Sequence, residues 1–193
     1  MKSITARKLS AWSWNGFQEE KVYIDWVGDQ PEILVDSSTG EIKKVHFFVT
    51  TVGVSNLIYA EAFEDEKLPN FIAGTVHALE SYGAVPKYLV PDNLKTAITK
   101  HTKDELVINS VYQDLENFYD VVILPPPPRK PKGKPTVEKY VQFLETHLLE
   151  DLKEKVYYSI EDINRDVRQK NSGHQQREKD LPVPFQNGKF PSI

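Results

Sequence analysis

A nearly continuous apolar segment, Val45–Val52 (VHFFVTTV), constrains the fold of this chain most strongly. A run of this length, rich in β-branched and aromatic residues, predicts a strand that is buried on both faces. Strand-like segments also lie at Lys21–Val27 and Asn56–Phe63, with a short one at Glu32–Asp36. Because the connections between them are short, we expect an antiparallel series of strands at the start of the fold.

After Phe63 the apolar residues change to a helical period, and from there helices and strands alternate. The predicted elements are a helix over Leu68–Tyr82 ended by Gly83, a strand at Lys87–Val90, a helix over Ile108–Tyr119, a strand at Val121–Leu124 and a helix that begins at Pro135. The order β-β-β-α-β-α-β-α predicts an α/β fold with a mixed sheet flanked by helices.

The length of 193 residues is that of one domain with tails. We divide it into an N-terminal arm (1–19), a core (20–157), and a C-terminal helix with a polar tail (158–193). Ser159 and Asp162 form a variant of the capping box at the start of that helix. From Asn171 onward the chain is polar and contains three prolines, which predicts a tail.

Composition excludes several classes of protein. The chain has no cysteine, which excludes a disulfide scaffold, a thiolate metal site and cysteine catalysis. No apolar run approaches the ~20 residues of a membrane span, and the N-terminus lacks the apolar segment of a secretory signal. We therefore expect a cytoplasmic protein with no membrane partner. There is no phosphate-binding G-x-x-x-x-G-K-[ST] loop, and the five histidines lack metal-ligand spacing, which favours core or surface roles.

The charge is unevenly distributed. The net charge of −4 argues against a chain that is basic throughout, as many nucleic-acid-binding domains are. One segment between Pro126 and Tyr140 nevertheless holds five basic residues and one acid. A solvated loop followed by a solvated helix explains this charge, and a phosphate-binding segment explains it as well. The five basic residues are Arg129, Lys130, Lys132, Lys134 and Lys139.

Three acids stand out by position. Asp25 interrupts an apolar strand, Asp92 follows the strand Lys87–Val90, and Glu138 lies in the first turn of the helix from Pro135. Each has a structural explanation by itself: a solvent-facing strand residue, a turn or N-cap, and a contact with the helix dipole. If the first and fourth strands of the predicted order are neighbours, however, all three carboxylates can converge at one end of the sheet.

Clustered carboxylates repel one another and are held together by hard divalent cations. Two Mg²⁺ ions ~3.5–4 Å apart activate a water or a DNA 3′-hydroxyl and stabilise the leaving oxygen in phosphoryl transfer. This chemistry needs oxygen ligands alone, which fits a chain without cysteine.

Three segments carry a resemblance to a known family: Tyr23–Asp29 (YIDWVGD), Leu89–Thr96 (LVPDNLKT) and Pro131–Glu138 (PKGKPTVE). Together they resemble the catalytic core of DDE transposases of the retroviral-integrase superfamily, most closely the IstA-type insertion-sequence transposases, which work with an ATPase helper. The resemblance runs from about Lys21 to Arg177 and implies a ribonuclease H-like fold.

The resemblance also implies roles for residues. Asp25, Asp92 and Glu138 match the catalytic acids, which in the family bind two Mg²⁺ ions, with Mn²⁺ as a substitute. Lys95 and the basic segment match positions near DNA. The implied reaction is cleavage at an element end, followed by attack of the freed 3′-hydroxyl on target DNA. The implied partners are DNA (element ends and target), a second copy in a dimer or higher assembly, and an ATPase helper.

The chain also departs from the family pattern. Only 24 residues precede Asp25, too few for the usual DNA-reading region, and Leu181–Ile193 does not continue the resemblance. We therefore expect an excised core or a truncated copy. Two alternatives stay open: a non-catalytic remnant that binds DNA or a full-length transposase, and a ribonuclease H-like nuclease that acts on other nucleic acid.

Overall fold

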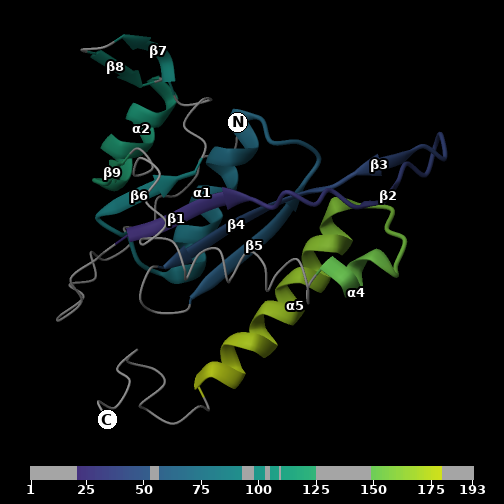
Figure 1. Cartoon of the computed structure of the whole chain (residues 1–193). Helices are drawn as coiled ribbons and strands as arrows, with labels where there is room; N and C mark the ends of the chain where they lie inside the picture. Colours follow the sequence, from purple (N-terminus) through teal and green to yellow (C-terminus); the bar gives the residue numbers. More distant parts are fainter. Residues whose placement is uncertain are drawn as a thin grey trace, which may run out of the picture.

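A five-stranded mixed sheet forms the centre of the molecule (Figure 1). The computed structural model describes residues 21–52, 57–92, 98–102, 105–108, 110–124 and 149–179. The strand order is β5-β4-β1-β6-β9; β5, β4 and β1 pair antiparallel, whereas β1, β6 and β9 pair parallel. The strands are β1 (Lys21–Trp26), β4 (His46–Val52), β5 (Ile58–Phe63), β6 (Tyr88–Pro91) and β9 (Val122–Ile123).

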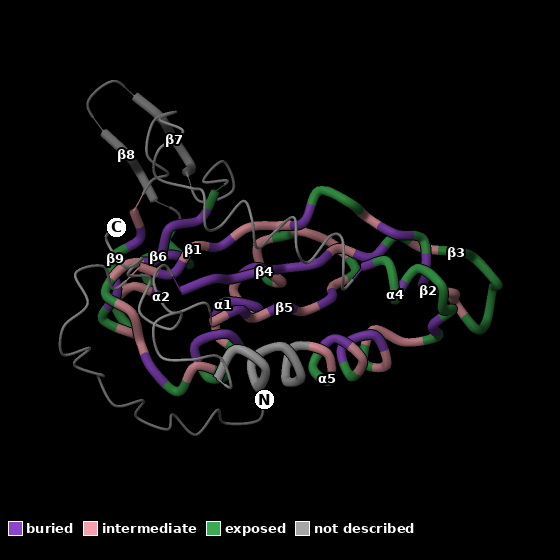
Figure 2. The backbone as a smooth tube through the Cα atoms, turned by 60° about the horizontal axis from the view of Figure 1, so that its bottom comes forward, coloured by how far each residue is buried: buried purple, intermediate pink, exposed green. Residues whose placement is uncertain are grey.

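The predicted α/β architecture is confirmed in this sheet and its helices. The five strands of this sheet, together with α1 (Leu68–Tyr82) and α2 (Ser110–Tyr119), follow the order β-β-β-α-β-α-β along the chain. The apolar run that anchors the prediction is β4, and every residue of this strand after His46 is buried (Figure 2). The predicted helix from Pro135 lies mostly outside the described residues, as does the arm 1–19.

Helix α1 covers one face of the sheet with an aromatic core. The ring of Phe48 in β4 makes edge-on contacts with the rings of Trp26, Phe63 and Phe71, at centroid distances of 5.4, 6.3 and 5.8 Å. A Cβ atom on Gly74 of α1 would lie 2.7 Å from Phe48 Cδ1, so only glycine allows the helix to lie this close to the sheet. The helix ends at Gly83, which has φ of 64° as the sequence predicts.

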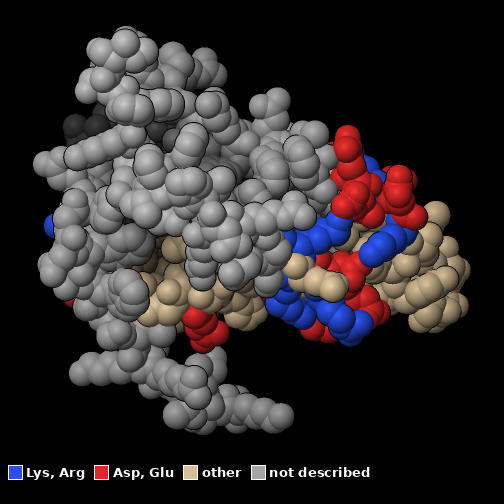
Figure 3. Space-filling model, turned by 90° about the horizontal axis from the view of Figure 1, so that it is seen from below, with Lys and Arg blue, Asp and Glu red and all other residues tan. Residues whose placement is uncertain are grey.

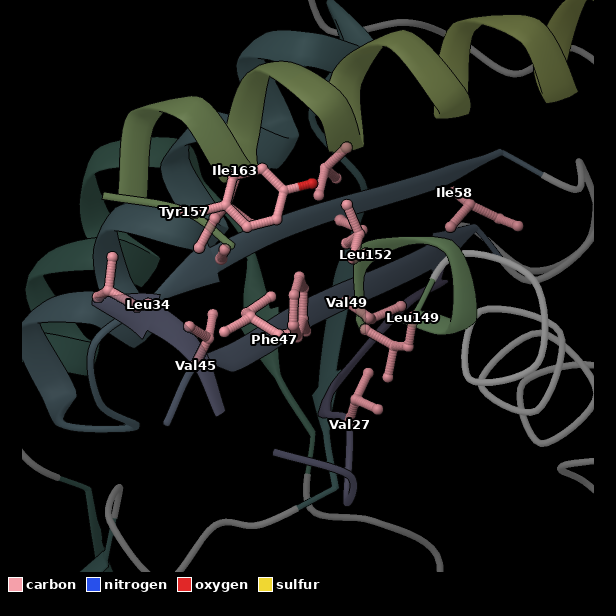
Figure 4. Close-up of a cluster of buried hydrophobic side chains, with 14 residues drawn as sticks. Val27, Leu34, Val45, Phe47, Val49, Ile58, Leu149, Leu152, Tyr157 and Ile163 are labelled. Carbon is pink, nitrogen blue, oxygen red and sulfur yellow. The ribbon is translucent and has the colours of Figure 1, made fainter. Parts of the chain in front are cut away.

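Helices α4 (Glu150–Lys153) and α5 (Ile160–Lys179) cover the opposite face with a largely aliphatic core. Figure 4 shows Leu149, Leu152 and Ile163 directed toward side chains of the sheet. Helix α5 begins as the sequence predicts, because the Asp162 backbone N–H donates to Ser159 Oγ at 3.1 Å.

The two edges of the sheet are closed by helix side chains. At β5, the Ala62 N–H donates to Asn164 Oδ1 at 2.6 Å, and Asn164 Nδ2 donates to the Ala62 carbonyl at 3.1 Å. At β9, the Ile123 N–H donates to Glu116 Oε1 at 2.7 Å. Each side chain satisfies backbone groups that an uncovered edge strand would leave unpaired.

Two small hairpins form separate two-stranded sheets. They are β2 (Glu32–Val35) with β3 (Ile42–Lys44), and β7 (Ile98–Thr102) with β8 (Glu105–Ile108). The second hairpin is absent from the sequence prediction, which wrongly places Ile108 on a helix. The predicted buried strand at Val121–Leu124 is also partly wrong, since Val122 is 47% exposed at the sheet edge.

Helix α5 is longer than the sequence predicts. It continues to Lys179, so residues 171–179 are helical where the polar composition predicts a tail. A helix gains one hydrogen bond for each residue added once it is nucleated, and Gln, Arg, Glu and Lys are good helix formers. In the described ranges no helix has the length and apolar character needed to cross a membrane.

Candidate active site

Asp25 and Asp92 lie side by side at the carboxyl ends of neighbouring strands. Strands β1 and β6 pair parallel, and the last residue pair of this ladder is Ile24 with Pro91. Asp25 follows Ile24 within β1, Asp92 directly follows the end of β6, and the Asp92 N–H donates to the Ile24 carbonyl at 2.8 Å. Because neighbouring strands lie ~4.8 Å apart, the two backbones are within reach of one shared cation. The condition for the two aspartates to converge, that their strands are neighbours in the sheet, is therefore met.

The Asp25 side chain lies on the sheet face that α4 and α5 cover. Asp25 is directly opposite Val49 of β4, and Val49 belongs to the core on that face. Opposed residues of an antiparallel pair point to the same face, and successive residues of a strand alternate. Accordingly Trp26, the next residue, packs on the α1 face. Asp25 is half-buried and Asp92 is exposed, so the site opens to solvent on the Asp92 side.

A backbone hydrogen bond fixes one oxygen of the Asp25 carboxylate. The Trp26 N–H donates to Asp25 Oδ1 at 2.8 Å. The following donor, the Val27 N–H, bonds the Phe47 carbonyl of β4. Since backbone donors alternate along a strand, the Trp26 N–H is directed to the β6 side, where Asp92 lies. This role of Trp26 has no signal in the sequence, because a backbone donor does not depend on residue type.

The remaining predicted site residues lie outside the described residues. Most of them lie between residues 125 and 148, and the structure describes the residues on either side of this interval. Leu124 follows β9, and its N–H donates to the Leu89 carbonyl of β6 at 2.8 Å. Leu149 is 1% exposed and packs in the core on the face of Asp25. The residues outside the description are Glu138, Lys95, Arg129, Lys130, Lys132, Lys134 and Lys139.

The donor set suits a hard divalent cation. Asp25 and Asp92 offer carboxylate oxygens, which Mg²⁺ and Mn²⁺ prefer over nitrogen or sulfur. No group of three or more potential metal ligands occurs within the part of the chain that the structure describes. The two carboxylates at neighbouring strand ends therefore suit the part of a divalent-metal site that the sheet supplies. A third protein ligand would come from another segment.

The surface at α4 and α5 carries many charged side chains, and these form ion pairs with one another. The basic side chains described from Lys153 to Lys170 are paired with acids, for example Lys155 with Asp166 at 2.7 Å and Arg168 with Glu161 at 2.6 Å. The Lys155 ammonium, with the Tyr157 hydroxyl, holds the pKa of Asp166 below its usual value. Figure 3 shows basic and acidic side chains intermixed on the described surface. Each ion pair of this kind neutralises a positive charge that would otherwise attract a DNA phosphate.

The sequence matches proteins that are named as transposases. A protein of Sinorhizobium fredii named as transposase y4uI is 35% identical over 148 residues, which are 77% of this chain and 29% of the relative. A protein of Burkholderia multivorans named as the transposase of insertion sequence IS408 is 36% identical over 149 residues, which are 77% of this chain and 28% of the relative. This chain is a relative of insertion-sequence transposases. It spans less than a third of the length of these two proteins.

Solved structures identify the fold. A chain of the simian T-cell lymphotropic virus intasome, solved in complex with PP2A regulatory subunit B56 gamma, has a TM-score of 0.53 and 13% identity over 89% of this chain and 56% of that one. The catalytic core domain of BIV integrase has a TM-score of 0.50 and 14% identity over 77% of this chain and 80% of that one. No model of a protein family matches the chain. The predicted ribonuclease H-like integrase-core fold and the resemblance to insertion-sequence transposases are confirmed.

Proposed function

We propose that this chain is the catalytic core of a transposase that cleaves and joins DNA with the help of divalent metal ions. The observation that carries the proposal is the placement of Asp25 and Asp92 at adjacent carboxyl ends of β1 and β6. Ligands of open α/β sheets bind at the carboxyl ends of strands. The relationship to transposases supports DNA as the substrate.

Asp25, Asp92 and Glu138 would hold the metal in this proposal. When bound, two Mg²⁺ ions lower the barrier of phosphoryl transfer by activating the attacking oxygen and stabilising the leaving one. The protein's part is to place the ligands: the Trp26 N–H orients the Asp25 carboxylate, and the exposure of Asp92 admits the phosphodiester.

The described ends of the interval 125–148 support Glu138 as the third ligand. The interval starts at Leu124, at the carboxyl end of the strand next to β6, and ends at Leu149, on the sheet face of Asp25. Glu138 lies near the middle of this interval. An extended chain spans ~3.3 Å per residue, so either end allows Glu138 to reach the aspartates.

The same interval supports DNA binding by the basic segment. Arg129 is five residues beyond Leu124, close in sequence to a described point at the active end of the sheet. Arg129, Lys130, Lys132, Lys134 and Lys139, with Lys95 after Asp92, would bind phosphates and position the duplex without reading its sequence. Cationic side chains near α4 and α5, such as Lys155 and Arg168, are paired with acids. The basic segment is therefore the stronger candidate for binding DNA phosphates.

Assembly and localisation follow from the proposed reaction. Joining two element ends needs two active sites, so we include a dimer or higher assembly in the proposal. We include an ATPase helper because of the resemblance to IstA-type transposases, and a cytoplasmic location because a bacterial protein meets the DNA that it joins there.

A DNA-nicking assay tests the proposal. Supercoiled plasmid is incubated with the chain and Mn²⁺, and nicked product is compared for the wild type, Asp25→Asn and Asp92→Asn. The matched control is Asp29→Asn, since Asp29 follows Asp25 by four residues and pairs with Lys153 on the surface. Loss of a metal-bound carboxylate is expected to cost about 4 kcal/mol of transition-state stabilisation, a roughly thousandfold lower rate.

The control is expected to nick at the wild-type rate. Full activity of Asp25→Asn would remove Asp25 from the active site. Cleavage of RNA–DNA hybrid in preference to DNA would favour the nuclease alternative.

A further inference from the structure

Over the residues that the structure describes, the ladder between β1 and β6 ends at the candidate site. Its last bond joins the Asp92 N–H to the Ile24 carbonyl. The next donor of β1 on that side is the Trp26 N–H, and its partner is Asp25 Oδ1 instead of β6. Beyond Ile24, the strand therefore keeps its ladder on the β4 side, through the Val27 N–H and the Phe47 carbonyl.

The Trp26 indole anchors this end of β1. It packs edge-on against Phe48 at a centroid distance of 5.4 Å and against Phe63 at 5.8 Å, with both interplanar angles at 75°. Phe48 is fully buried and is itself held by the close approach of Gly74. Aromatic pairs in this geometry contribute more than their buried area alone. The Trp26 backbone is thus fixed from the face opposite to the Asp25 carboxylate.

We propose that Trp26 is a positioning residue for the metal site. Its indole holds the end of β1 against the aromatic core, and its N–H holds the Asp25 carboxylate toward Asp92. This inference rests on the proposed function, since it needs Asp25 to bind the metal. Groups that orient metal ligands typically affect metal affinity by 10–100-fold.

Three variants separate positioning from packing. Trp26→Leu removes the edge-on ring contacts, whereas Trp26→Phe keeps a ring in the cluster. Phe71→Leu is the control, because Phe71 packs on Phe48 from α1 at 5.8 Å within the same core. The Mn²⁺ dissociation constant is measured by calorimetry for each folded protein, and the urea midpoint reports stability. Amide hydrogen exchange at residue 26 is measured in the metal-free protein.

Both leucine variants are expected to lower the urea midpoint. Only Trp26→Leu is expected to raise the Mn²⁺ dissociation constant, by about tenfold, and to accelerate amide exchange at residue 26. Trp26→Phe is expected to bind Mn²⁺ within about threefold of the wild type, since it keeps the ring that anchors the strand. Wild-type Mn²⁺ affinity in Trp26→Leu would overturn the inference.

Asp25→Asn distinguishes failure of this inference from failure of the proposed function. It is expected to abolish the Mn²⁺ binding that the wild type shows. If Asp25→Asn binds Mn²⁺ as the wild type does, or the wild type binds none, the metal site is wrong and both proposals fall. If Asp25→Asn loses binding while Trp26→Leu keeps it, only the positioning role of Trp26 is wrong.

Discussion

The two faces of the sheet use the same strands for different purposes. On the α1 face, Trp26, Phe48, Phe63 and Phe71 form an aromatic cluster with edge-on ring contacts. On the α4–α5 face an aliphatic core ends beside Asp25. Two consecutive residues of β1, Asp25 and Trp26, thus belong to different faces. Strand alternation lets a rigid core hold a polar site without sharing its side chains.

The largest stability effect is expected on the α4–α5 face, at Asn164. Asn164→Leu leaves the buried Ala62 N–H and carbonyl without their partners. Each unsatisfied buried group costs about 1–3 kcal/mol, so the loss of both partners is expected to cost about 2–6 kcal/mol of unfolding free energy. Urea denaturation measures the loss. A loss below about 1 kcal/mol would mean that water replaces the side chain at this edge.

A second prediction concerns ligand binding on that face. Mn²⁺ at 100 times its dissociation constant is expected to stabilise the wild type by about 2.7 kcal/mol, because the ion binds the folded state. The same addition is expected to leave Asp25→Asn unchanged and to stabilise Asp29→Asn fully. Thermal unfolding with and without Mn²⁺ measures both effects. Equal stabilisation of all three proteins would place the ion away from Asp25.

A third prediction concerns the α1 face alone. Gly74→Ala drives its Cβ into the ring of Phe48, which neighbouring rings hold in place. Overpacking of this kind costs about 1–3 kcal/mol, offset by up to about 1 kcal/mol of helix propensity. Chemical denaturation is expected to show a net loss of unfolding free energy. A variant as stable as the wild type would show that the Phe48 ring moves aside without cost.

The smallest expected effect is the pH dependence from His77 of α1 and Glu61 of β5. The Glu61 carboxylate bonds His77 Nδ1 at 2.9 Å and raises the pKa of His77 above its ordinary 6.5. A raised histidine pKa contributes stability that is complete below pH 6.5 and is lost as pH rises through the higher folded value.

Because His77 is 47% exposed, solvent screening limits this contribution to less than about 1 kcal/mol. The wild type is therefore expected to lose slightly more stability than His77→Asn between pH 6 and pH 8. Urea midpoints at the two pH values measure the difference. An identical pH dependence in both proteins would contradict the assignment.

Local signals in the sequence predict much of the fold. The apolar run predicts β4, the helical period and Gly83 predict α1 with its end, and Ser159 predicts the start of α5. Each of these elements is determined by neighbouring residues. The closure of the sheet edges is not, since Asn164 bonds a residue 102 positions away.

The candidate site likewise depends partly on local sequence and partly on contacts between distant residues. Residue type and motif identify Asp25 and Asp92, but their proximity depends on β1 and β6 being neighbours, which no local pattern determines. A helical crossover between parallel strands is compatible with that arrangement without requiring it. The β7–β8 hairpin was missed because its two short strands carry mixed residue types with weak alternation.

A crystal structure with Mn²⁺, in which the anomalous signal locates the ion, shows whether Asp25 and Asp92 bind one metal site. We expect an anomalous peak within about 2.1 Å of carboxylate oxygens of both Asp25 and Asp92. We expect no such peak in crystals of Asp25→Asn grown under the same conditions. A wild-type crystal at saturating Mn²⁺ with no peak between the ends of β1 and β6 would contradict the claim that these two strands carry the metal site.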